Sequence, residues 1–132
     1  MFPGPTLMAA LTATIETALN RALALDPAGR KALLEALTGI VEFRIMEPFP
    51  VTVTLQACQE QVQVGGVPAE DPVLVLSGRP LAFAALASGD NAVFSEGRLA
   101  VAGDTGLAHE FQRALNQLKP DWEAALAQRV GD

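Results

Sequence analysis

The sequence predicts an α+β fold, in which grouped strands form one sheet and helices cover one side or the ends of it. Two amphipathic helical segments come first, four strand segments then follow one another, and one more strand lies among the helical segments of the remainder. Strands grouped in this way favour an α+β fold over alternating βαβ units. A chain of 132 residues is long enough to bury one hydrophobic core. We therefore expect a single domain over 1–132.

The first two segments have the hydrophobic period of helices. Apolar side chains recur every four residues from Leu7 to Leu23, which predicts an amphipathic helix over residues 5–25. Asp26 is suited to cap a second helix over 27–38, whose first residue is a proline.

The hydrophobic period changes to two after these helices. Residues 41–45, 51–56 and 62–64 alternate apolar with polar side chains, which predicts three half-buried strands of an antiparallel meander. Residues 73–76 are apolar on both faces, so we expect an interior or doubly covered strand there. A fifth strand is predicted over 98–102.

The second half of the chain carries apolar helices. Residues 81–87 contain no charged side chain, and a helix that is apolar all round is buried or borders an apolar cavity or partner. The segment 107–118 places Phe111 and Leu115 on one apolar face. A final helix is predicted over 122–128.

Composition excludes several classes of partner. The net charge is −6, and nothing supplies the clustered Lys and Arg that nucleic acid or an anionic bilayer requires. Cys58 is the only cysteine, so no internal disulfide can form, which fits a cytoplasmic protein. The chain shows neither a basic signal-peptide start nor an uncharged apolar run long enough to span a membrane.

The tripeptide Asp104-Thr105-Gly106 raises the question of catalysis, because an aspartic protease carries its catalytic carboxylate on such a loop. That chemistry needs two aspartates that share a proton across a dimer axis, on an all-β scaffold. Here a helical pattern begins directly after Gly106. We therefore expect Asp104 to cap that helix.

Other reactive side chains form no recognisable site. His109 is the only histidine, so a histidine-rich zinc site is excluded, and Cys58 is expected to be a small filler. The turn from Gly103 to Gly106 has no lysine to help it bind a phosphate. The sequence therefore predicts no catalytic residue, no metal and no cofactor.

The segment 95–108, SEGRLAVAGDTGLA, resembles the signature of the sterol carrier protein type 2 family. That signature is a Gly-basic-Leu strand, a Gly-Asp turn and a helix that begins near Leu-Ala. Pro80-Leu81 and the apolar helix that follows match the family in order. The resemblance implies an SCP2-like sheet of about five strands, with helices over one face and an apolar cavity for lipid.

Residues 121–123, Asp-Trp-Glu, resemble the end of this domain in a bacterial subgroup, the accessory factors of ubiquinone biosynthesis. The resemblance implies a non-catalytic domain that holds polyisoprenoid intermediates of ubiquinone (coenzyme Q) while other ubiquinone-biosynthesis proteins act on the head group. The family's C-terminal helical segment is expected to be absent from this chain.

We therefore predict a lipid-binding accessory domain whose ligand tail lies among apolar helical side chains. The predicted lipid-binding residues are Leu11, Ile15, Leu19, Phe83, Leu86, Phe111, Leu115, Leu118 and Trp122. Two alternatives stay open: an assembly module whose apolar groove binds a partner helix, and the protease. A symmetric homodimer through the first helix is also possible.

Overall fold

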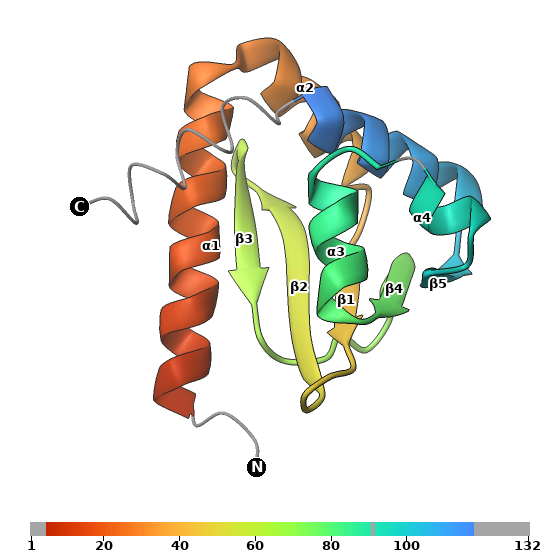
Figure 1. Ribbon diagram of the computed structural model, residues 1–132. Helices are drawn as coiled ribbons and strands as arrows, with labels where there is room; N and C mark the ends of the chain where they lie inside the picture. Colours follow the sequence, from red (N-terminus) through yellow and green to blue (C-terminus); the bar gives the residue numbers. More distant parts are fainter. Residues whose placement is uncertain (1–4, 91, 118–132) are drawn as a thin grey trace.

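A computed structural model describes residues 5–90 and 92–117 of the chain, and at its centre lies one sheet (Figure 1). Its strands are β1 Val41–Ile45, β2 Val51–Cys58, β3 Gln61–Gly65, β4 Leu74–Gly78 and β5 Leu99–Gly103. The five strands lie in the order β3-β2-β1-β4-β5. β1 pairs with β4 in parallel and the other neighbours pair antiparallel. The sheet is therefore mixed, and the α+β class is confirmed.

The helices cover one face of this sheet. They are α1 Pro5–Leu25, α2 Pro27–Ala36, α3 Pro80–Ala87 and α4 Ala92–Ser95, with a further helix over 105–117. In Figure 1, α1 runs beside the edge strand β3, and α3 lies in front of β1 and β2. Phe43 of β1 makes ring contacts both with Phe83 of α3 and with Phe111 of the 105–117 helix. Both of these helices therefore pack on the same face.

Strand register explains why this face is apolar. Phe43 lies opposite Val53 of β2 and Leu76 of β4, and side chains alternate between the two faces along each strand. The neighbouring residues Glu42 and Arg44 therefore point to the other face. The alternation that predicts half-buried strands also predicts which side the helices cover.

The element boundaries differ from the predicted ones in a few places. The first helix has the predicted bounds, but α2 ends at Ala36 rather than near Thr38, because Leu37 already leaves the helical conformation with φ −87° and ψ 66°. β4 continues to Gly78. The short helix α4 was not predicted, because its four residues are too few to show a helical period. The helix predicted over 122–128 lies outside the described residues.

One interpretation of the composition of α3 was that the helix is buried on all sides. The structure shows that this interpretation is wrong. Ala82 and Leu86 are buried, whereas Leu81 is 83% exposed. Leu81 lies in the first turn of the helix, and Ala84, three residues further on, is also exposed. The other interpretation, that the helix borders an apolar cavity, is confirmed below.

Polar side chains fix α1 to the edge of the sheet. The Asn20 amide donates to the Val62 carbonyl oxygen and accepts from the Val62 N–H, both at 2.9 Å. One turn earlier, Glu16 accepts a hydrogen bond of 2.8 Å from the Val64 N–H. These bonds satisfy backbone groups of β3 that an edge strand otherwise leaves open. They hold α1 against the edge of the sheet.

Asp104 caps the 105–117 helix, as predicted. Its side-chain oxygen accepts a hydrogen bond of 3.2 Å from the Leu107 N–H, and its carbonyl oxygen accepts one of 3.1 Å from the Ala108 N–H. The preceding Gly103 has φ +109°, and a Cβ there would collide with the carbonyl oxygen of Val73. Asp26 caps α2 in the same manner, accepting from the Gly29 N–H at 2.9 Å. Both predicted caps are confirmed.

Candidate ligand-binding cavity

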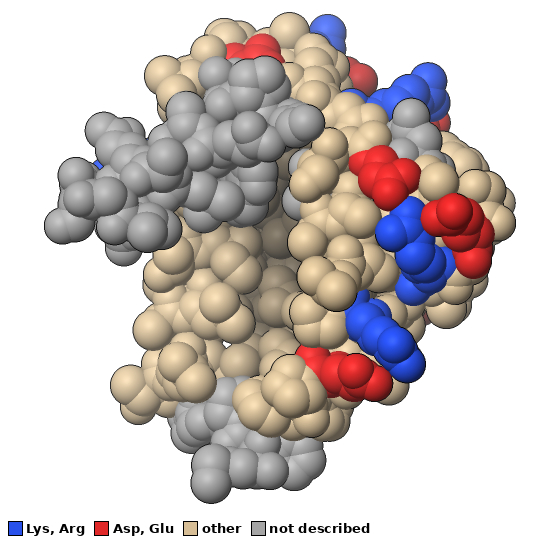
Figure 2. Space-filling view, in the orientation of Figure 1, with Lys and Arg blue, Asp and Glu red and all other residues tan. Residues whose placement is uncertain are grey.

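An apolar cavity of about 230 Å³ lies between the sheet and the helices. Every side chain that lines it is aliphatic or aromatic: Ile15, Leu19, Phe43, Ile45, Val53, Leu55, Phe83, Leu86, Phe111 and Leu115. In the space-filling view a hollow opens between the α1 side and the α3 side, and its visible walls carry no charged residue (Figure 2). The Lys, Arg, Asp and Glu side chains near it lie on the surface to the right of the hollow.

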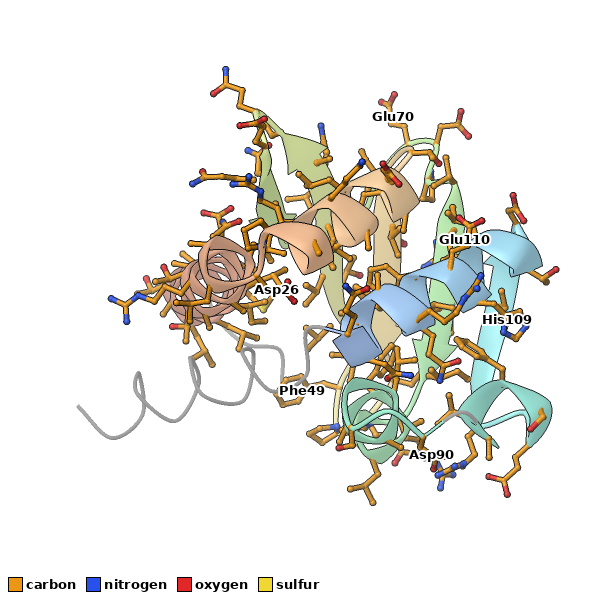
Figure 3. All side chains as sticks on the ribbon, turned by 90° about the horizontal axis from the view of Figure 1, so that it is seen from above. Asp26, Phe49, Glu70, Asp90, His109 and Glu110 are labelled. Atoms are coloured by element: carbon orange, nitrogen blue, oxygen red, sulfur yellow. The ribbon has the colours of Figure 1, made fainter. Side chains whose placement is uncertain are left out.

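Each wall of the cavity comes from a different element. β1 and β2 supply the floor, where the register brings Phe43 beside Val53. α1 forms one side with residues four apart, and four-residue spacing places side chains on one face of a helix. α3 and the 105–117 helix form the remaining walls. Seen from above, α1 and α3 are both viewed nearly end-on, on either side of this space (Figure 3).

The structure brings most of the predicted helical side chains together. Those that line the cavity are Ile15, Leu19, Phe83, Leu86, Phe111 and Leu115. Leu11 does not line it: it lies one turn nearer the start of α1 and is 41% exposed. Leu118 and Trp122 lie outside the described residues.

The sequence-based prediction missed the floor of the cavity. Phe43, Ile45, Val53 and Leu55 lie there, and all of them stand on the inward face that the strand alternation marks. The alternation was a usable signal for burial. It could not separate side chains that pack against a helix from side chains that face a cavity.

Aromatic rings close the deeper part of the cavity. The Phe43 and Phe83 rings meet edge to face with centroids 5.7 Å apart, and the Phe43 and Phe111 rings meet at the same distance with a tilt of 41°. Phe111 is completely buried. Such pairs contribute about 0.5–1.5 kcal/mol each beyond their burial, so this end of the cavity is well fixed.

No polar side chain faces the cavity from the described residues, so it offers neither an acid or base nor a nucleophile. His109 is exposed, and its ring meets the Phe94 ring edge to face with centroids 5.6 Å apart. In Figure 3, His109 and Glu110 lie on the part of the 105–117 helix away from α1. Cys58 is exposed at the end of β2, so the expectation that it is a small filler is wrong.

Across residues 5–90 and 92–117, no three His, Cys, Asp or Glu side chains gather where they could hold a metal ion. Among the helices described, none is both long and apolar enough to cross a bilayer.

A buried carboxylate lies on the other face of the sheet. Glu42 is completely buried and accepts hydrogen bonds from the Ala69 N–H at 2.8 Å and from Arg44 Nε at 2.6 Å. Burial raises the pKa of the Glu42 carboxyl group, but the hydrogen bonds from Ala69 and Arg44 lower it by more, so the pKa lies below its ordinary value. Glu42 thus binds the connection between β3 and β4 to the sheet and takes no part in the cavity.

The fold and the cavity together define the class of protein. It is an α+β domain whose mixed sheet and helices surround an apolar cavity. The chain belongs to the SCP-2 sterol transfer family, whose model matches residues 19–116. The structure itself bears out this family's fold, which the sequence signature implied.

Solved structures of the same fold cover 77% to 91% of the chain. The UbiJ-SCP2 ubiquinone synthesis protein superposes with a TM-score of 0.67 and 22% identity, over 90% of this chain and 96% of that chain. The sterol carrier protein domain 2 of Helicoverpa armigera gives 0.63 and 18%, over 91% and 95%. Palmitated SCP2L2 from Aedes aegypti gives 0.57 and 18%, over 77% and 91%. No curated protein sequence matches the chain.

Proposed function

We propose that this protein is a non-catalytic carrier that holds polyisoprenoid intermediates of ubiquinone biosynthesis in its cavity for the biosynthetic enzymes. The observation that carries the proposal is the lining of the cavity, in which every side chain is apolar. An isoprenoid tail needs no hydrogen-bonding partner, and each buried methylene group contributes about 0.8 kcal/mol to its binding. A polar head group gains nothing inside such a cavity, because burying it without hydrogen bonds costs free energy.

The structural similarities support a lipid and favour the ubiquinone pathway. SCP2L2 of Aedes aegypti was solved in a palmitated form, so a protein of this fold carries a fatty acyl chain. UbiJ-SCP2 is named as a ubiquinone synthesis protein, and the Asp-Trp-Glu segment of the present chain resembles the same group. We propose the isoprenoid as ligand on these two grounds together.

The proposed ligand contacts are the side chains of the cavity wall. Predicted helical residues such as Ile15, Phe83 and Phe111 are joined there by the floor residues Phe43 and Val53. Leu118 and Trp122 stay predictions for the same role. The proposal further includes a cytoplasmic location, docking of other ubiquinone-biosynthesis proteins and a homodimer, and it treats residues 1–132 as one lipid-binding domain.

Lipid extraction followed by mass spectrometry tests the proposal. The purified protein is expected to release an isoprenoid quinone or phenol in an amount comparable with the protein. A variant with Leu115→Trp, which fills the cavity, is expected to release much less, while Leu25→Trp, on an exposed position of α1, serves as the matched control.

The result also decides between the carrier and the assembly module. If no isoprenoid copurifies and none is taken up from vesicles, the carrier proposal fails. A synthetic amphipathic helix that binds the wild-type protein, and not Leu115→Trp, would then identify the groove as a site for a partner helix.

A further inference from the structure

We propose that the cavity encloses only part of an isoprenoid tail, and that the next part lies along an external track formed by Leu7 and Leu11 of α1. The inference rests on the proposed function and adds a second ligand subsite to it. It follows from the size of the cavity, from the apolar stripe on α1, and from the way α1 is held to the sheet.

The cavity is small for a polyisoprenoid. Its volume is about 230 Å³, and an apolar cavity of about 150 Å³ accommodates one benzene molecule of six carbons. In proportion, this cavity encloses about nine or ten carbon atoms, which is two isoprene units. A longer tail therefore extends beyond the space that the described residues line.

An apolar stripe leads out of the cavity along α1. Leu19 is 4% exposed and lines the cavity, and Ile15, one turn earlier, lines it while being only half-buried. The next positions in the series are Leu11, which is 41% exposed, and Leu7, which is 60% exposed. Side chains four apart are neighbours on a helix surface, so Leu11 and Leu7 extend the apolar series from the cavity wall onto exposed surface.

The anchoring of α1 does not depend on these leucines. Other side chains hold the helix: Met8 and Thr12 approach Gly66, where an added Cβ would be 3.2 Å and 3.6 Å from them, and Glu16 and Asn20 bond to β3. Glu16 is the only charged residue between positions 5 and 20. α1 therefore places no charged side chain beside Leu7 and Leu11, and the contacts named above, all among described residues, involve neither leucine.

The length of the track sets the length of tail that it can hold. Leu7 and Ile15 are eight residues apart, which corresponds to about 12 Å along a helix. An extended isoprene unit spans about 5 Å, since four chain bonds each advance about 1.2 Å. The track holds about two further units, so affinity is expected to rise with tail length up to about twenty carbons and then level off.

Prenols of increasing length test this inference. Their affinities for the wild-type protein are measured by displacement of a fluorescent fatty acid, and the C20 prenol is expected to bind about tenfold more tightly than the C10 prenol, with little change beyond C20. A double variant, Leu7→Ser with Leu11→Ser, is expected to bind the C10 prenol as the wild type does and the C20 prenol only as tightly as the C10 prenol.

Two further variants complete the experiment. Leu25→Ser changes a leucine that is 67% exposed at the other end of α1 and is expected to leave all affinities unchanged. Leu7→Ser alone is expected to lose part of the C20 advantage, which keeps the test decisive if the double variant proves unstable.

The outcomes separate the track from the function. A wild-type affinity that stops rising at C10, or a double variant that weakens all prenols equally, overturns the track and leaves the cavity proposal intact. Unchanged prenol affinities together with altered vesicle binding or altered self-association also overturn it, because the leucines then serve a bilayer or a second copy of the chain. Failure of the wild type to bind even the C10 prenol overturns the proposed function instead.

Discussion

Asp104 shows how the surroundings of one residue decide its role. The Asp-Thr-Gly tripeptide alone matches a protease loop, but the carboxylate stands between β5 and the 105–117 helix and accepts a hydrogen bond of 3.2 Å from the Leu107 N–H. A catalytic dyad needs a second aspartate that shares its proton. The hydrogen bond and the strand-to-helix position instead identify Asp104 as an N-cap.

Replacing Asp104 tests this assignment. Asp104→Ala is expected to lower the free energy of unfolding by about 1 kcal/mol, because the Leu107 N–H loses its acceptor. Asp104→Asn is expected to stay close to the wild type, because Asn caps helices as well as Asp does. Thermal unfolding of the three proteins provides the measurement, and an Ala variant as stable as the wild type contradicts the cap.

Glu42 predicts a dependence of stability on pH. The folded-state pKa of its carboxyl group is lowered, so the ionised form stabilises the fold above the unfolded-state pKa, and this stabilisation is lost as the pH falls through the folded-state pKa. Glu42→Gln removes the titrating group. The difference in melting temperature between wild type and variant is therefore expected to be greatest near neutral pH and to shrink in acid.

The comparison with Glu42→Gln is needed because another carboxyl group has a lowered pKa and also makes stability depend on pH. The pKa of Asp90 is also lowered, first by the hydrogen bond from Arg98 and then by that from the Ala92 N–H. Both proteins keep this contribution, so it cancels in the difference. A difference that stays constant from neutral pH into acid contradicts the role assigned to Glu42.

At the scale of elements, the position of α1 depends on its bonds to β3. Asn20→Ala leaves the N–H and the carbonyl oxygen of Val62 without their partner, and an unsatisfied buried group costs about 1–3 kcal/mol. We expect a loss in this range, and faster hydrogen exchange at Val62. Glu16→Gln, which keeps an acceptor for the Val64 N–H, is the milder control. Unchanged exchange at Val62 in Asn20→Ala contradicts this anchoring.

The elements themselves were largely predictable from local patterns. The full length of α1 follows from its four-residue period, and the start of α2 follows from the cap at Asp26. Periodicity gave no signal for α4, because four residues make barely one turn. It also could not give the parallel pairing of β1 with β4, because that pairing joins segments separated by two other strands.

At the scale of the whole molecule, the cavity was the least predictable feature. The same aliphatic side chains can close a solid core or line a cavity, and their hydrophobicity is identical in both cases. Ile15 and Phe83 were predicted as ligand contacts from helical faces, whereas Val53 was assigned only to the inward face of a strand. The three-dimensional structure, in which the helices stand apart from the sheet, is needed to show that these residues face one cavity.

The cavity also predicts the effect of filling it. Leu115 lines the cavity and is half-buried, so Leu115→Trp is expected to place an indole ring in the ligand space. Affinity for a C10 prenol is expected to fall at least about tenfold, which corresponds to the loss of about two buried methylene groups. Leu25→Trp is expected to bind as the wild type does, and equal affinities for the two variants contradict the location of the site.

Uptake of a polyisoprenoid from vesicles tests the central claim most directly. Wild-type protein is incubated with neutral vesicles that contain a long-chain polyisoprenoid, separated from them, and analysed by mass spectrometry for bound lipid. The apolar cavity predicts about one isoprenoid per chain in the wild type and much less in Leu115→Trp. A wild-type protein that leaves the vesicles without isoprenoid, while remaining folded, contradicts the claim that the cavity carries such a ligand.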